Sequence, residues 1–245
     1  MESKPLHSYY RMVLGGKELH CEFAFPETVR YFGDWCTGPV DGNGAVRISE
    51  WFWQKVSANI GPKSPYIEYT AFSSVASVGL LDSDRFLLHA VAFRWGNGAW
   101  LITGPPGTGK STHVRILNEQ YNNVFTVISG DRPVLEKNKD GSFFVHPSPW
   151  NGKEGWHGAD GAFLAGIICL QRGNENQIRP LSTKGAAPLV FISIIQTGEY
   201  EEDVRKAASL EENLLKSIPV WQLTSFEPLG SATLLYNALF TGEEN

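Results

Sequence analysis

Short apolar runs separated by turn residues predict a series of β-strands through the middle of the chain. The runs 86–93 and 99–103 flank a Gly-Asn-Gly turn at 96–98, so we expect them to pair as an antiparallel hairpin. A helical pattern over 111–121 follows, and the apolar run 124–129 predicts the next strand. This stretch therefore has the strand, helix and strand alternation of an α/β protein.

Two further hairpins are predicted downstream. The runs 134–136 and 143–146 surround an Asp-Gly turn. The runs 162–171 and 177–181 surround a Gly-Asn turn in the same way. In each case we expect the two neighbouring strands to pair with each other.

Helical spacing of apolar residues returns toward the end of the chain. The segment 201–218 places Val204, Ala207, Leu210 and Leu214 on one face, which predicts an amphipathic helix. The other expected elements are a helix over 50–58 capped by Ser49, a helix capped by Ser182 or Thr183 and running through Gln196, a strand over 219–223, and a helix from Pro228 to near Phe240.

The first 80 residues carry strand-like runs at 9–14 and 19–25 around a Gly-Gly turn, and otherwise look irregular. We therefore predict an α/β fold with two parts. A β-rich N-terminal lobe over 1–80 precedes a core over 81–245 that is built on a mixed sheet.

Composition excludes several functional classes. The net charge of -5 gives no electrostatic reason to expect nucleic acid as a partner. No apolar run approaches the roughly 20 residues of a membrane span, and the N-terminus lacks an apolar signal region. The cysteines are odd in number and have no metal-binding spacing, so we expect reduced thiols in a cytoplasmic protein: Cys21, Cys36 and Cys169.

One motif carries most of the chemical information. Residues 104–111 read Gly-Pro-Pro-Gly-Thr-Gly-Lys-Ser, a complete Walker A loop between an expected strand and an expected helix. Lys110 is placed to reach the β- and γ-phosphates, and the Ser111 hydroxyl to hold Mg²⁺. The helix N-terminus adds positive potential at the phosphates. We expect nucleotide to be bound by Gly104, Pro105, Pro106, Gly107, Thr108, Gly109, Lys110, Ser111 and Thr112.

A metal-nucleotide site also needs a carboxylate on a neighbouring strand. Asp131 closes the apolar run 124–129 and lies 21 residues after Lys110, which leaves room for one helix and the next strand. We therefore expect Asp131 to hold Mg²⁺ together with Ser111. AAA+ motors have a longer insertion before an Asp-Glu pair, so the short spacing and the single acid argue against that class.

The ordered set of motifs resembles a known family. His89, the Walker A loop, Asp131, the Ser-Pro-Trp-Asn-Gly stretch at 148–152 and the strand at 218–223 together resemble the HPr kinase/phosphorylase-like proteins. These share the fold of ATP-dependent phosphoenolpyruvate carboxykinase. The resemblance covers roughly residues 60–240 and is closest to short bacterial relatives, some of which phosphorylate peptides.

The resemblance implies roles for several residues. It places His89 near the phosphates, whereas taken alone this histidine would more often lie satisfied in the core. Relatives often carry two adjacent acids, one for Mg²⁺ and one as the base toward the acceptor hydroxyl, but here Gly130 replaces the first acid. We expect Asp131 to serve both roles, or Glu154 or His89 to replace the lost group.

The segment 147–161 combines proline, glycine, tryptophan and charge, which suits a mobile loop that binds the acceptor. The alternative is a solvated loop that its tryptophans hold in place. Arg132 and Arg172 are candidates for neutralising phosphate charge, or else cations at strand ends. Three other histidines have no ligand spacing and are interpreted as ordinary: His113, His146 and His157.

These features predict an ATP- and Mg²⁺-dependent kinase. By resemblance its acceptor is a seryl hydroxyl on a peptide or protein, with a hydroxyl of a small metabolite next. The second hypothesis is a nucleotide-binding regulatory module without transfer, in which case Gly130→Asp would gain activity. A carboxykinase acting on a C4 acid ranks last, because the chain is short and shows no set of carboxylate-binding arginines. A homo-oligomer stays open, and neither nucleic acid nor membrane is expected as a partner.

Overall fold

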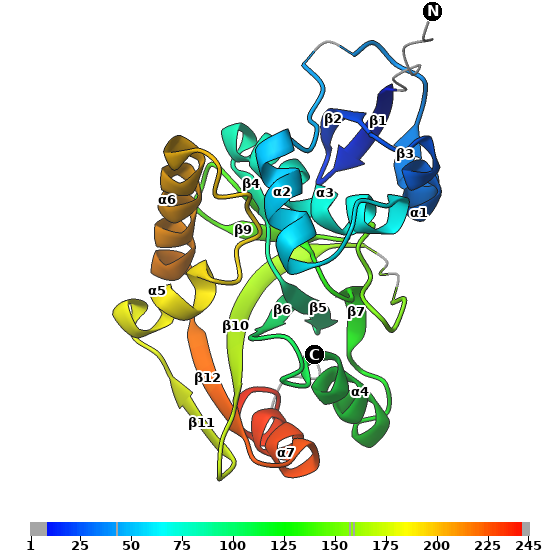
Figure 1. The fold of residues 1–245 in the computed structure, drawn as a ribbon. Coiled ribbons are helices and arrows are strands. Elements are labelled where there is room, and N and C mark those ends of the chain that lie inside the picture. The colour runs from blue at the N-terminus through cyan, green and yellow to red at the C-terminus, as the bar shows by residue number, and fades with distance from the viewer. Residues whose placement is uncertain (1–8, 43, 157, 159, 242–245) are drawn as a thin grey trace, which may run out of the picture.

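The computed structural model describes residues 9–42, 44–156, 158 and 160–241. Within these residues the larger sheet consists of β4 (Arg85–Leu87), β5 (Ala90–Trp95), β6 (Gly98–Thr103), β7 (Thr126–Ser129), β8 (Val134–Lys137), β9 (Phe143–His146), β10 (Ala162–Arg172), β11 (Gln177–Pro180) and β12 (Val220–Ser225). Seven strands follow the order β4-β8-β9-β10-β6-β5-β7, while β12 lies beside β10 and β11 beside β12 (Figure 1). The fold is therefore mixed α/β, as predicted.

The strand that leads to the Walker A loop has one antiparallel and one parallel neighbour. β5 pairs antiparallel with β6 across the predicted turn, with Ala90 opposite Thr103 and Trp95 opposite Gly98. On its other side β6 pairs parallel with β10. Both faces of this region are buried, because alternate residues of β5 belong to different hydrophobic clusters: Ala90 and Ala92 to one, Val91 and Phe93 to the other.

The predicted hairpin of 162–171 with 177–181 is wrong. Both strands exist, but β12 lies between them and pairs parallel with β10 and antiparallel with β11. The physical reason is that β11 and β12, either of which could pair with β10, differ in polarity. β12 is largely buried, with Leu223 fully so, whereas β11 is mostly exposed, and a polar strand belongs at the edge of a sheet.

The apolar run 86–93 is also divided. β4 ends at Leu87 and pairs with β8, while β5 begins at Ala90. Between them, the backbone N–H of His89 donates to the carbonyl of Ser193 at 2.8 Å, and the N–H of Ile195 donates to the carbonyl of Leu87 at 2.9 Å. The segment 192–196 was expected to be helical, but it leaves the preceding helix and runs beside the strand end that carries His89.

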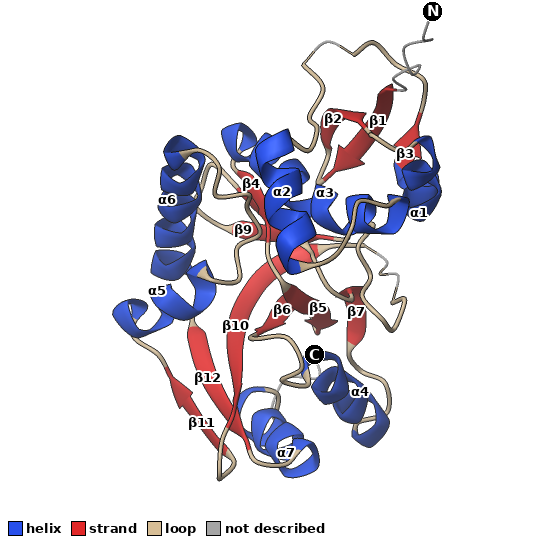
Figure 2. Cartoon of the chain, viewed as in Figure 1, coloured by secondary structure: helices blue, strands red, loops and turns tan. Residues whose placement is uncertain are grey.

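Helices cover both faces of the larger sheet (Figure 2). Helices α4 and α7 pack together over one face, and α5 and α6 pack together over the other. Serine caps α5 and proline opens α7, as predicted, and acidic residues fill the first turn of α6. Their bounds are α4 (Lys110–Gln120), α5 (Thr183–Phe191), α6 (Glu201–Ser217) and α7 (Pro228–Leu239).

A smaller antiparallel sheet lies in the N-terminal part, with β1 (Tyr9–Leu14) between β2 (Lys17–Glu22) and β3 (Cys36–Thr37). The helices of this part are α1 (Val29–Phe32), α2 (Glu50–Asn59) and α3 (Pro65–Leu80), with short 3₁₀ turns at Pro26–Thr28, Gly33–Trp35 and Leu81–Ser83. Its hydrophobic cluster also contains Leu87, Val134 and Trp150, so this part packs directly on the larger sheet. The domain boundary at residue 80 stays a prediction.

Helix α3 was not predicted, because its sequence has little amphipathic period. Eight of its residues are buried, among them Glu68, Phe72 and Leu80, so it presents no wide polar face. Local signals do mark its start: the Ser64 side chain accepts a hydrogen bond from the N–H of Ile67, and proline occupies the first turn. No helix in the described part of the chain is long and apolar enough to cross a membrane.

Candidate functional site

Glycines set the path of the Walker A loop. Gly104, Gly107 and Gly109 have φ values of 149°, 77° and 100°, a region that favours glycine. A Cβ at Gly104 would also lie 2.3 Å from the carbonyl oxygen of Leu170 on β10. The loop therefore favours glycine at all three positions for its dihedral angles, and at Gly104 also for its close packing on the neighbouring strand.

The N-terminus of α4 is left open to an anion. The longer helices of the described chain have either a side-chain cap or acidic residues in the first turn, whereas α4 begins at Gly109 with neither. Its first amide groups thus have no side-chain acceptor from its N-cap, and the helix dipole favours negative charge there. An oxyanion such as phosphate satisfies both conditions.

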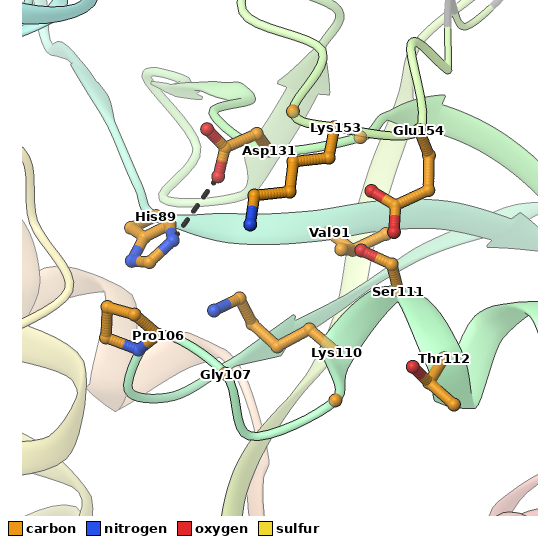
Figure 3. A pocket seen from close by; sticks show the side chains of 13 residues that line it. His89, Val91, Pro106, Gly107, Lys110, Ser111, Thr112, Asp131, Lys153 and Glu154 are labelled. Carbon is orange, nitrogen blue, oxygen red and sulfur yellow. Dashed lines mark ion pairs between the residues drawn. The ribbon is translucent and has the colours of Figure 1, made fainter.

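A cavity of about 400 Å³ opens in front of this helix (Figure 3). All four residues predicted to be catalytic line it, although they come from four separate segments of the chain. The lining residues are His89, Val91, Pro106, Gly107, Gly109, Lys110, Ser111, Thr112, Gly130, Asp131, Gly152, Lys153 and Glu154. Of the predicted nucleotide-binding residues, Gly104, Pro105 and Thr108 do not line the cavity. Thr108 instead donates its side-chain hydroxyl to the carbonyl of Pro105 at 2.8 Å and so closes the back of the loop.

Asp131 follows the end of β7 and lies between the side chains of His89 and Arg132. Its Oδ1 is 3.3 Å from Nε2 of His89, and its Oδ2 is 3.1 Å from Nε of Arg132. Burial acts to raise the pKa of Asp131, but the hydrogen bond from His89 and the charges of Arg132, His89 and Lys110 outweigh it and lower the pKa. The carboxylate is therefore ionised at neutral pH, as a metal ligand or general base requires.

Lys110 is only 8% exposed and points into the same cavity. Its Nζ donates to the carbonyl of Gly104 at 3.0 Å and lies 3.4 Å from that of Pro105. Burial lowers the pKa of Lys110, and the nearby charge of Asp131 opposes this effect. Because the hydrogen-bond partners of this buried ammonium are loop carbonyls, an anion in the cavity would stabilise its charge.

The loop expected to be mobile is held firmly in its first half. Trp150 is 2% exposed and donates its ring N–H to the carbonyl of Tyr69 at 2.9 Å, while the Tyr69 hydroxyl donates to the carbonyl of Pro149 at 3.0 Å. These contacts fix the loop to α3. The following segment 152–155 is exposed, and Lys153 and Glu154 in it line the cavity.

Gly130 has no room for the acid that relatives often carry. A Cβ there would lie 2.4 Å from the carbonyl oxygen of Asn151 and 3.2 Å from Cβ of Trp156. The glycine therefore allows the loop to lie against the end of β7. The earlier expectation that Gly130→Asp restores a missing group has to be corrected, because an aspartate cannot be added without displacing the loop.

Lys153 is a candidate site residue that the sequence did not single out. In Figure 3 its ammonium group and that of Lys110 enter the cavity from opposite sides. Among the described residues no hydrogen bond or ion pair to Lys153 is found. Its position next to Glu154 was the one feature of the sequence that could have identified it. A lysine in a polar loop is usually exposed to solvent, so this position alone did not indicate a site residue.

The remaining candidates have defined positions. Arg172 donates to the carbonyl of Gly107 at 2.6 Å and so supports the apex of the Walker A loop. His113 is fully buried, with Nδ1 2.8 Å from the carbonyl of Gly109 and Nε2 2.8 Å from Oγ of Ser231. This histidine positions the loop rather than being an ordinary core residue. His146 pairs with Glu136 at 2.8 Å, and His157 lies outside the described residues.

Within the described residues no group of three or more His, Cys, Asp or Glu side chains could hold a metal ion. A magnesium ion bound with nucleotide takes most of its ligands from phosphate and water, so the predicted pair of protein ligands, Ser111 and Asp131, is compatible with this result. The described cysteines Cys21, Cys36 and Cys169 form no disulfide, as predicted.

No protein-family model matches the chain, and no curated protein matches it. Among solved structures, it is similar to the Hpr(Ser) kinase/phosphatase from Coxiella burnetii. The two are 14% identical, and the alignment covers 62% of this chain and 95% of that chain with a TM-score of 0.35. This is a distant likeness.

Proposed function

We propose that this protein is an ATP- and Mg²⁺-dependent phosphotransferase that phosphorylates a hydroxyl group. The observation that carries the proposal is the convergence of Lys110, Ser111, Asp131 and His89 on one cavity at an uncapped helix N-terminus. Phosphoryl transfer depends mainly on positioning and on compensation of charge, and these residue types supply both.

The donor polyphosphate would lie along the Walker A loop. The amides at the start of α4 and the ammonium of Lys110 would compensate its charge, and Lys153 would add a second cation from the opposite wall. Ser111 and Asp131 would hold Mg²⁺, which when bound offsets phosphate charge and orients the terminal phosphoryl group.

Asp131 is also placed to assist the acceptor. In the transfer, the acceptor oxygen forms a bond to the terminal phosphorus, the bond to the nucleoside diphosphate breaks, and the hydroxyl proton passes to a carboxylate. The lowered pKa of Asp131 keeps its carboxylate ionised and so free of a proton before transfer, and His89 orients it through the 3.3 Å contact. Glu154 lines the same cavity and is the alternative base.

The acceptor is a seryl hydroxyl on a peptide or protein, as the sequence resemblance implies, or a hydroxyl of a small metabolite. A nucleotide-binding regulatory module without transfer is the second candidate. The observation that favours it is the close contact at Gly130, which excludes the second acid found in many kinases of the resembling family.

The test is transfer of label from γ-phosphate-labelled ATP with Mg²⁺ in a lysate of the source organism. The lysate is separated into a protein and peptide fraction and a small-metabolite fraction, and Lys110→Ala is compared with the exposed control Lys139→Ala. Label that depends on Lys110 and survives Lys139→Ala supports the kinase, and the fraction that carries it identifies the acceptor class. Nucleotide binding without such label would support the regulatory module instead.

A further inference from the structure

A second cavity adjoins the phosphate site and shares His89 with it. Its volume is about 300 Å³, and its walls come from α2, α3 and the segment 192–196. Helices α2 and α3 belong to the N-terminal part of the chain, so this cavity exists only because that part packs on the larger sheet. Neither the Walker A loop nor the residues assigned to magnesium line it.

The two residues that contact the Asp131 carboxylate both face this second cavity. His89 and Arg132 line it, and both contact the Asp131 carboxylate. Arg132 also donates from Nη1 to the carbonyl of Thr70 at 2.7 Å and to Oγ of Ser73 at 2.6 Å, which ties Asp131 to α3. A molecule in the second cavity therefore lies next to the groups that orient the proposed base.

The chemistry of the walls is mixed. Buried Phe52 and mostly exposed Ile60 supply apolar surface, and Ile192 stands at the rim with 81% of its surface exposed. Against this surface, Oε1 of Gln196 is buried and accepts no hydrogen bond in the described structure. A buried acceptor without a donor is costly, so a ligand that brings an N–H or O–H group would favour a turn of the Gln196 side chain that exposes Oε1 to the cavity.

The walls are held in place before any ligand arrives. Lys55 of α2 donates from Nζ to the carbonyl of Thr197 at 3.1 Å, and Ser49 donates to Glu199 at 2.8 Å. The segment 192–196 is in turn hydrogen-bonded to the strand end at His89. A preformed cavity of this kind binds a ligand without first having to order its own walls.

We propose that the second cavity is the acceptor site, and that it selects a hydroxyl compound with a compact apolar group and a neighbouring N–H or O–H donor. The apolar group contacts Phe52, Ile60 and Ile192, the donor meets Gln196, and the hydroxyl reaches Asp131 past His89. A seryl peptide with an apolar neighbour offers this chemistry, and so does a free amido alcohol. This inference rests on the proposed transfer reaction.

The experiment measures transfer of labelled phosphate to three probes: acetyl-Leu-Ser-Leu-amide, acetyl-Asp-Ser-Asp-amide and N-acetyl-leucinol. The expected result is a KM for the leucyl peptide or for N-acetyl-leucinol at least tenfold below that for the aspartyl peptide. Gln196→Leu and Ile192→Asp should each raise the KM of the preferred probe about fivefold or more. Leu229→Asp, an exposed apolar position away from both cavities, serves as the matched control and should leave that KM at the wild-type value.

The outcomes separate the two proposals. If lysate components take up Lys110-dependent label while the probes do not, or if leucyl and aspartyl peptides have equal KM values, the acceptor-site inference is overturned and the kinase stands. An unchanged KM in both Gln196→Leu and Ile192→Asp has the same meaning. If neither lysate nor probes take up such label, the kinase proposal fails and this inference falls with it. Preference for the peptide or for the amido alcohol identifies the source of the acceptor.

Discussion

Replacing Gly130 tests the packing that joins the loop to the phosphate site. A Cβ at this position would lie 2.4 Å from the backbone carbonyl oxygen of Asn151, about 1 Å inside ordinary van der Waals contact. The obstacle is backbone, and the buried Trp150 holds that backbone to α3, so it cannot move aside as a flexible side chain would. Gly130→Ala must therefore displace the loop or the end of β7.

The expected cost follows from this overlap. Overpacking of a well-packed site costs about 1–3 kcal/mol, which lowers the Tm of a domain of this size by roughly 2–10 °C. The displacement also reaches the chemistry, because Gly152 packs against Asp131: a Cβ at Gly152 would lie 3.3 Å from that of Asp131. We therefore expect Gly130→Ala to lower both the Tm and the rate of Lys110-dependent phosphoryl transfer, and Gly130→Asp to do so more strongly.

The assay is thermal unfolding followed by circular dichroism, together with transfer of label from ATP. Gly185→Ala is the control, since it also adds a methyl group, but within α5, where the nearest atom would be 3.4 Å away. It should leave the Tm unchanged or raise it slightly. A Gly130→Ala protein with the wild-type Tm, or a Gly130→Asp protein with faster transfer, would refute the argument.

Three further predictions follow from single contacts. Lys153→Ala should raise the KM for ATP about 10- to 100-fold in steady-state kinetics, because it removes a charge-assisted contact to phosphate, while Lys139→Ala should not. His113→Ala should cost about 1–3 kcal/mol in urea unfolding, because it removes a fully buried ring that hydrogen-bonds both the Gly109 carbonyl and Oγ of Ser231; an unchanged midpoint would contradict this. Glu211 is 7% exposed and burial raises its pKa to about 7, so ionising its side chain opposes folding. The free energy of unfolding of Glu211→Gln should therefore exceed that of wild type by up to ~3 kcal/mol at pH 8, and this difference should vanish as the pH falls to 4. A difference that does not depend on pH would contradict the assignment.

Local signals predicted the features that local physics determines. The Walker A glycines, the turn that pairs β5 with β6, and the capping serines Ser49 and Ser182 each act within a few residues. The sequence could therefore locate the phosphate-binding helix and the strand that ends at Asp131. It also brought together His89, Lys110, Asp131 and Glu154, which now lie in one cavity.

The errors have a common cause in long-range packing. β12 occupies the place beside β10 instead of β11 because it buries more apolar surface there. The turn residues between β10 and β11 give no indication of this arrangement. Helix α3 is hidden because it is buried on several sides and so lacks a clear period. The hydrophobic cluster of the N-terminal part includes Leu87, Val134 and Trp150, and this long-range contact helps to fix the loop after β9.

Arg132 shows why the acceptor side was harder to predict than the donor side. A phosphate-binding loop is continuous in sequence, so its residue types and spacing identify it. The groups around Asp131 come instead from separate elements, with Arg132 reaching across to Thr70 and Ser73 on α3. Under the proposed function, such an arrangement would let the N-terminal part shape the acceptor site while the Walker A motif stays the same. If so, chains with the same Walker A loop but a different N-terminal part would use the same donor and select different acceptors.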